Sequence, residues 1–132
     1  MPTVIIAAQN PLQFDNINLD QGYSGGRGYG QSKLAQILFT MDLARELEGK
    51  VIVNALHPAT LMNTSMVQNA GIQPRSTIDD GATAVMQLIT GADIGTGQYY
   101  NGLRAGRANA QAYDESAREQ LRTLSARLTG VR

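Results

Sequence analysis

Apolar side chains along the chain gather into short β-branched runs that alternate with stretches of helical periodicity. Residues 3–8 (Thr-Val-Ile-Ile-Ala-Ala) and residues 51–56 (Val-Ile-Val-Asn-Ala-Leu) are two such runs, and runs of this kind are typical of strands buried on both faces. Residues 97–102 form a shorter run that lies between turn residues. The pattern therefore predicts three strands.

Helical spacing predicts three helices between and after these strands. The first runs from about Tyr29 to Glu48, with Gly49 as its stop. The second begins with Ser76 or Thr77 as its N-cap and ends at Gly91, and its apolar face consists of Ala82, Val85, Met86, Leu88 and Ile89. The third runs from about Asn109 to Leu128 and stops at Gly130, whereas residues 9–30 and 59–76 are predicted to be irregular.

The alternation of strands and helices predicts the fold class. Strands joined by helices pair in parallel through right-handed crossovers. We therefore expect a single α/β domain over residues 1–132: a partial Rossmann-like, doubly wound fold with about three parallel strands flanked by helices. A sheet of this size leaves strand edges open to partners.

Composition removes several classes of function. The 132 residues carry no net charge, one His and no Cys, which excludes disulfides, thiolate metal sites and a Cys nucleophile and disfavours nucleic acid as a partner. The apolar run at Val4 to Ala8 is too short for a membrane span or a signal peptide. We expect a soluble cytoplasmic protein without a metal. His57 is interpreted as structural, and Asp79 and Asp80 as helix-capping residues.

The candidate chemistry lies in Tyr29-Gly-Gln-Ser-Lys33-Leu-Ala. Tyr and Lys four residues apart on a helix project from the same face. An ammonium beside a phenol stabilises the phenolate, so such a pair can act as an acid or base near neutral pH. Spacing alone also fits a Tyr at a helix start followed by a solvated Lys. Of Tyr99 and Tyr100 on the third strand, one is expected to pack inside and the other to face outward.

The order of these motifs resembles the short-chain dehydrogenase/reductase family, in its retinol-dehydrogenase-like branch. The likeness rests on Tyr29-x-x-x-Lys33, the long helix that follows, the segment Asn54-Ala-Leu-His-Pro58 and the closing segment Leu124-Ser-Ala-Arg-Leu-Thr-Gly130, and it covers residues 4 to 130. It implies that Tyr29 transfers a proton and that Lys33 supports it and binds the nicotinamide ribose. It also implies that NADP or NAD contacts Pro58, Ala59, Thr60 and Thr64, with NADP slightly favoured, and that the substrate is an apolar carbonyl or alcohol.

Two departures from the family pattern bear on activity. The family begins with a strand, a Gly-rich turn and a helix that bind the nucleotide, and we expect that half to be absent from this chain. The glycines from Gly22 to Gly30 follow a polar loop rather than a strand, so we interpret them as a flexible start of the catalytic helix. In addition, Ile5 and Ile6 stand where the family has a Ser that donates a hydrogen bond to the substrate carbonyl.

These departures leave three hypotheses. The chain is the catalytic half of an oxidoreductase, inactive alone, whose nucleotide-binding half comes from another chain or from an upstream segment. Alternatively, it is a truncated relative that acts as a homo-oligomerising interaction module. The third alternative is a fragment produced by a split gene or a wrongly assigned start.

Overall fold

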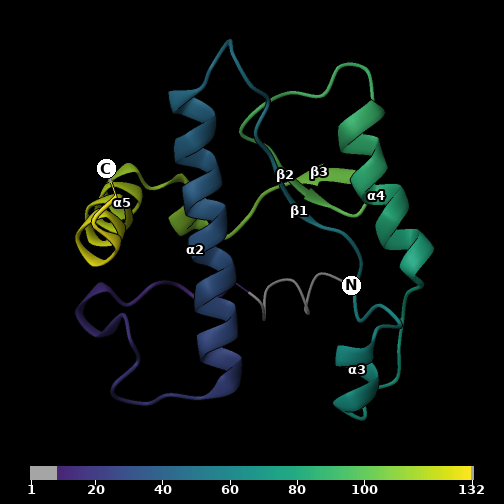
Figure 1. Ribbon diagram of the computed structural model, residues 1–132, viewed down its shortest axis with the longest axis horizontal. Helices are drawn as coiled ribbons and strands as arrows, with labels where there is room; N and C mark the ends of the chain where they lie inside the picture. The colour runs from purple at the N-terminus through teal and green to yellow at the C-terminus, as the bar shows by residue number, and fades with distance from the viewer. Residues whose placement is uncertain (1–8, 132) are drawn as a thin grey trace.

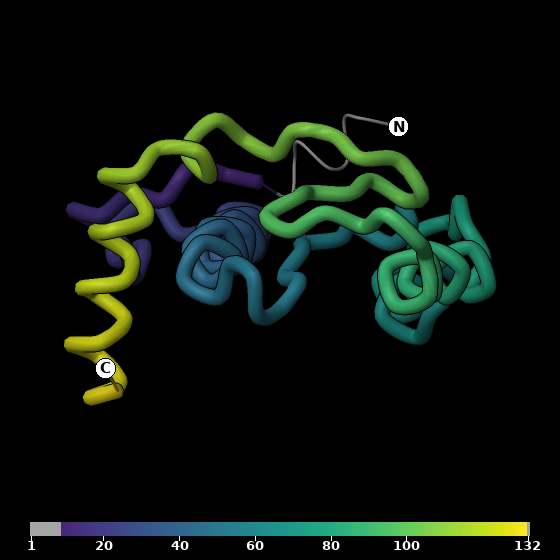
Figure 2. Tube along the Cα trace, turned by 90° about the horizontal axis from the view of Figure 1, so that it is seen from above, coloured from purple at the N-terminus to yellow at the C-terminus, as the bar shows by residue number. Residues whose placement is uncertain are grey.

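The computed structural model describes residues 9–131. In Figure 1, helix α2 lies between α5 and the sheet, and α4 lies beyond the sheet; the view from above in Figure 2 shows α5 and the α3–α4 pair on opposite sides of α2. The elements in chain order are the 3-10 helix η1 (Phe14–Asn16), α2 (Gly25–Glu46), β1 (Ala55–His57), α3 (Ser65–Asn69), α4 (Ile78–Thr90), β2 (Tyr99–Asn101), β3 (Arg104–Gly106), the 3-10 helix η2 (Ala110–Tyr113) and α5 (Glu115–Thr129).

The sheet has the strand order β1-β2-β3 and is mixed. Strand β1 pairs with β2 in parallel, with Ala55 opposite Tyr99, as expected. Strand β3 pairs with β2 in antiparallel fashion, with Ala105 opposite Tyr100, because a tight turn at Gly102, with φ of +58°, reverses the chain. The α/β class is confirmed. The third described strand is antiparallel, and all three of its residues are exposed, so the apolar pattern did not predict it. The strand predicted at residues 3–8 lies outside the described residues.

The second predicted strand is shorter than its apolar run. It was expected to begin at Val51, but β1 begins at Ala55, and the side chains of Val51 and Ile52 are 52% and 59% exposed. The intervening residues bond to a loop instead of a strand: the backbone N–H of Val53 donates to Thr96 Oγ1 at 3.0 Å, and Asn54 Nδ2 donates to the backbone oxygen of Gly95 at 2.7 Å.

Helix α2 begins at Gly25, earlier than its apolar spacing predicts. The hydroxyl of Ser24 accepts a hydrogen bond from the backbone N–H of Arg27 and caps the helix. The side chain of Gln31 then fastens the preceding loop to the helix, because it accepts from the N–H of Gln13 at 3.2 Å and donates to the oxygen of Ile17 at 2.7 Å. The glycine-rich segment is therefore mostly helical, and Tyr29 lies within α2 rather than at its first residue.

The predicted bounds of α4 are confirmed, with Thr77 as N-cap and Gly91 as C-cap. Its buried residues, however, are Gly81 and Ala84, whereas most of its predicted apolar face is exposed. The last predicted helix is divided at Asp114, whose carboxylate caps α5 by accepting from the N–H of Ser116 at 2.9 Å. Helix α3 lies in a stretch that was predicted to be irregular.

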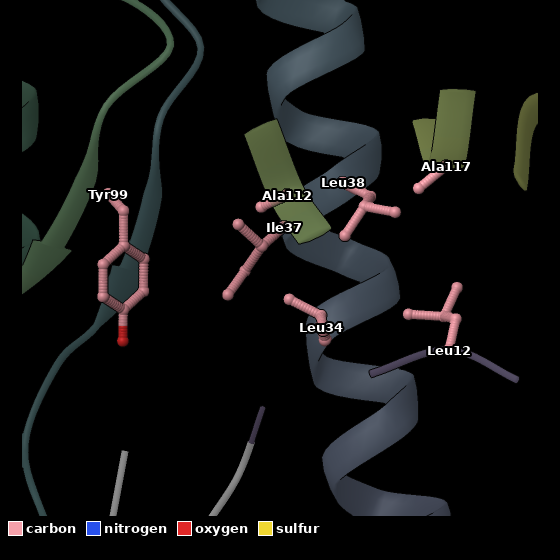
Figure 3. Close-up of a cluster of buried hydrophobic side chains, with 7 residues drawn as sticks. All are labelled: Leu12, Leu34, Ile37, Leu38, Tyr99, Ala112 and Ala117. Carbon is pink, nitrogen blue, oxygen red and sulfur yellow. The ribbon is translucent and has the colours of Figure 1, made fainter. Parts of the chain in front are cut away.

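The core lies on the side of α2 that faces η2, α5 and the sheet (Figure 3). Leu34 and Leu38 are completely buried there. The cluster consists of Leu12, Leu34, Ile37, Leu38, Tyr99, Ala112 and Ala117. Burying a Leu side chain contributes about 1.5–3 kcal/mol, so this cluster holds α2 in place and thereby fixes the side chains on its neighbouring face.

Candidate functional site

Tyr29 and Lys33 stand one turn apart on α2, and the structure brings their side chains together. Lys33 Nζ lies 5.5 Å from the centroid of the Tyr29 ring. The tyrosine side chain is 49% exposed, so its hydroxyl can exchange protons with water. Lys33 Nζ also donates to Gln36 Oε1 in a long hydrogen bond of 3.5 Å. An ammonium has three donors, so Lys33 keeps donor capacity for a bound group.

Both side chains line a cavity of about 680 Å³ between α2, strand β1 and the segment that follows β1. Pro58, Ala59 and Thr64 lie on the wall opposite α2. The rest of that wall is mainly apolar and includes Leu61, Met62, Met66, Val67 and Ile72. Five of the predicted site residues therefore share one cavity whose chemistry suits an apolar ligand next to a phenol and an ammonium.

Thr60, the sixth predicted site residue, is 4% exposed and does not line the cavity. It lies in the turn behind the wall, where its backbone oxygen accepts from Ser76 Oγ at 2.7 Å. Its hydroxyl is 3.2 Å from His57 Nε2. The structure thus gives Thr60 contacts that hold the turn rather than a place on the binding surface.

His57 lies on the cavity wall at the end of β1, half-buried. Burial lowers the pKa of its imidazole, which favours the neutral ring. Its Nε2 and the Thr60 hydroxyl stabilise the turn that carries Pro58 and Ala59. This contact fits the structural role expected for His57 and also places the ring beside the ligand space.

Gln9 and Tyr99 also line the cavity, and the sequence did not predict them as site residues. Tyr99 and Tyr100 are 4% and 7% exposed, so the expectation that one faces outward is wrong, because both faces of β2 are covered. Tyr99 lines the cavity together with Gln9, and Gln9 Nε2 donates to the Tyr99 hydroxyl at 3.0 Å. Burial raises the pKa of Tyr99 to about 12. The two residues are 90 positions apart, and no local pattern signals such a contact.

Asp79 and Asp80 stand at the first turn of α4, as expected. Asp80 completes a capping box: its carboxylate accepts from the N–H of Thr77 at 2.8 Å, and its own N–H donates to the Thr77 hydroxyl at 3.1 Å. The hydrogen bond from the Thr77 backbone lowers the pKa of Asp80. This geometry is that of a helix cap.

Two kinds of site are not found between residues 9 and 131. No cluster of three or more His, Cys, Asp or Glu side chains in this part of the chain has the arrangement of a metal site. Within the same residues, no helix combines the length and the apolar character that a membrane crossing requires.

Comparison with known proteins finds similar chains among the retinol dehydrogenases. No protein-family model matches the chain. Retinol dehydrogenase 14 from Homo sapiens is 31% identical over 136 residues, which are 91% of this chain and 40% of that protein. Retinol dehydrogenase 13 from Homo sapiens is 31% identical over 140 residues, which are 91% of this chain and 42% of that protein. The chain thus spans about 40% of the length of these curated relatives.

A plant protein and a solved structure extend the comparison. The chloroplastic short-chain dehydrogenase TIC 32 A from Brassica napus is 36% identical over 64 residues, 46% of this chain and 20% of that protein. The crystal structure of an uncharacterized protein from Mycobacterium paratuberculosis superposes with a TM-score of 0.64 and 25% identity, over 94% of this chain and 47% of that one. The fold described above is therefore shared with a longer chain.

Proposed function

Because this chain is a relative of the retinol dehydrogenases within the short-chain dehydrogenase/reductase family, we propose that it forms the catalytic and substrate-binding part of a nicotinamide-dependent oxidoreductase. One observation carries the proposal: Tyr29 and Lys33 lie 5.5 Å apart, ring centroid to Nζ, and both line the apolar cavity. If Lys33 were only a solvated side chain next to a surface tyrosine, the two residues would not need to line a cavity together.

The residues around the cavity fit a nicotinamide nucleotide. Lys33 has donors free for a ribose hydroxyl, since its bond to Gln36 is long. Thr64 offers a hydroxyl, and Pro58 and Ala59 offer an apolar surface for a flat ring. When bound, NADP or NAD would supply a hydride to the substrate carbon in reduction, or accept one in oxidation.

Tyr29 is the proposed acid in carbonyl reduction, because it lies beside Lys33 and lines the cavity. Its O–H donates a proton to the carbonyl oxygen as the carbonyl carbon gains the hydride, and the product is the alcohol. The Lys33 ammonium stabilises the resulting phenolate, and water restores the proton because Tyr29 is 49% exposed. The apolar wall keeps water from the rest of the substrate. We therefore expect an apolar aldehyde, ketone or alcohol as the substrate.

The test has two stages on the purified chain. Fluorescence titration first asks whether NADPH or NADH binds saturably. Where it does, Tyr29→Phe is expected to lower turnover of an apolar aldehyde such as decanal by about 10²–10⁴-fold, the usual loss for a general acid. Tyr23→Phe is the matched control, because Tyr23 is also exposed but does not line the cavity. Full activity of Tyr29→Phe would contradict the proposal. Absence of nucleotide binding by a folded chain would contradict cofactor binding by this chain alone and would direct the same test to the chain combined with its nucleotide-binding half.

A second candidate is a self-associating interaction module without catalysis. It is favoured by one observation: Ile78, Val85 and Ile89 form an exposed apolar stripe on α4. Isolated exposed apolar residues are common, but a stripe at helical spacing is typical of a face that meets another surface. This alternative predicts assembly in solution, with a second copy of the chain as the partner.

A further inference from the structure

We propose that the hydroxyl of Tyr99 is a second hydrogen-bond donor to the substrate oxygen, acting together with Tyr29 in the same cavity. This inference rests on the proposed function, since it names a further residue of that site. Catalysis of carbonyl chemistry is faster when preorganised donors meet the oxygen on which negative charge develops. Tyr29 transfers its proton, and Tyr99 keeps its own and only donates a hydrogen bond.

The position of Tyr99 follows from the packing of β2 on α2. Its ring belongs to the buried cluster that includes Ile37, and Ile37 continues the α2 face that carries Tyr29 and Lys33 at four-residue spacing. Figure 3 shows the Tyr99 ring beside α2, with its hydroxyl pointing along the helix from the level of Leu38 to the level of Leu34. That is the direction of Lys33 and Tyr29 along α2. Tyr99 lines the cavity with both of them.

The hydrogen bonds of Gln9 leave the Tyr99 proton available. Gln9 Oε1 accepts from the backbone N–H of Asn109 at 2.6 Å, which fixes the orientation of the amide. Gln9 Nε2 must then face the phenol, and it donates to Tyr99 at 3.0 Å. A phenol has one donor and can still accept. Gln9 therefore uses the oxygen of Tyr99 as an acceptor, and the O–H remains free to point at a ligand in the cavity.

The protonation state of Tyr99 suits a donor. Burial raises its pKa to about 12, so the O–H is retained throughout the physiological range. Tyr29, by contrast, is half-exposed and can recover a lost proton from water. The two phenols of one cavity are thus placed for different tasks, one for proton transfer and one for hydrogen bonding.

Other hydroxyls on the described cavity wall are placed less well. The Thr40 hydroxyl donates to the backbone oxygen of Gln36 at 2.9 Å, so its hydrogen is already used. Thr64 lies on the wall opposite α2, at the side assigned to the cofactor. The sequence offers Ile5 and Ile6 where the family resemblance implies a donor, and these positions lie outside the described residues. Among the described residues that line the cavity, Tyr99 is the buried one whose hydroxyl hydrogen is not donated to another group.

The experiment measures ligand preference and needs no cofactor. Two probes of matched shape, 2-acetylnaphthalene and 2-ethylnaphthalene, are bound to the full chain in equilibrium dialysis, and the ratio of their dissociation constants reports donors that meet the ketone oxygen. Tyr99→Phe is expected to reduce the ketone preference by about threefold to tenfold, the worth of one net hydrogen bond, while the affinity for the hydrocarbon stays unchanged. Tyr100→Phe, equally buried on the same strand, is expected to change neither value.

A second variant guards against loss of folding in Tyr99→Phe. Gln9→Glu leaves the phenol in place but puts a carboxylate beside it, which accepts the Tyr99 hydrogen and should abolish the same preference. A preference that survives in Tyr99→Phe and Gln9→Glu but falls in Tyr29→Phe would overturn the role of Tyr99 and leave the proposed function standing. A wild-type chain that binds neither probe would overturn both together.

Discussion

At the level of single residues, the cavity is defined by two tyrosines that differ in their access to water. Tyr29 is 49% exposed and stands beside an ammonium, whereas Tyr99 is 4% exposed and stands beside an amide. A phenol that exchanges protons needs solvent or a relay, and a phenol that only donates a hydrogen bond benefits from burial. The difference in environment, rather than in residue type, separates their expected roles.

The burial of Tyr99 predicts its behaviour at alkaline pH. Because burial raises its folded pKa to about 12 from an unfolded value of about 10, the unfolded chain releases this proton first. The stability that the neutral phenol contributes is therefore present below about pH 10 and is lost as the pH rises toward 12, by on the order of 2 kcal/mol. A near-ultraviolet titration of tyrosinate, comparing wild type with Tyr99→Phe, should show that the variant lacks a transition near pH 12. A transition near pH 12 that persists in the variant would contradict the assignment.

The residues that the sequence identified and those that it missed differ in the range of their contacts. Tyr29 and Lys33 are four positions apart, so helical spacing predicted that they lie together. Gln9 and Tyr99 are 90 positions apart and are joined only when the N-terminal loop wraps around α2. Thr60 was placed in the site by motif, but its hydrogen bonds with His57 and Ser76 turn it away from the cavity.

At the level of elements, a partly buried ion pair joins α2 to α5. Asp42 accepts from Arg118 Nε at 3.2 Å, and both side chains are mostly buried, with 16% and 13% exposure. Arg122 Nη2 approaches the same carboxylate at 2.7 Å. Since α2 carries Tyr29 and Lys33, this contact supports the helix on the side away from the cavity.

Removing that carboxylate should loosen the packing of the two helices. Asp42→Asn is expected to lower the free energy of unfolding by about 1–3 kcal/mol, because it leaves the Arg118 guanidinium largely buried without its charged partner. Glu46→Gln is the control: Glu46 lies 3.9 Å from Arg122 and is 61% exposed, and exposed pairs contribute about 0–1 kcal/mol. Urea denaturation measures both variants. Equal effects of the two substitutions would show that burial of the pair does not matter.

Element ends were predicted where their signals are local. Thr77 and Gly91 bound α4 because a capping box and a glycine lie in the sequence itself. The start of α2 was missed because its first turns are glycine-rich and are fastened by Gln31 to a distant loop. Strand β3 was missed because its residues are all exposed and its pairing follows from the turn at Gly102.

At the level of the whole molecule, apolar patterns that predicted burial end on the surface. Val51 and Ile52 are more than half exposed, and so are Ile78 and Ile89 of α4. Periodicity predicts which side chains share a face, but it does not show what covers that face. The parallel pairing of β1 with β2 was predictable from alternation, whereas the exposure of these apolar faces required the structure.

The exposed stripe of α4 predicts association of the isolated chain. Each of Ile78, Val85 and Ile89 is at least 42% exposed, and hiding such side chains from water gains about 25 cal/mol per Å² of apolar area. With no net charge to keep copies apart, the chain is expected to form dimers or larger assemblies at micromolar concentration, measured by light scattering. Val85→Glu combined with Ile89→Glu should restore the monomer mass. Leu128→Glu, which changes an equally exposed residue of α5, should not. A monomeric wild type would remove the support for the interaction module and leave the cavity, with Tyr29 and Lys33, as the feature that function has to explain.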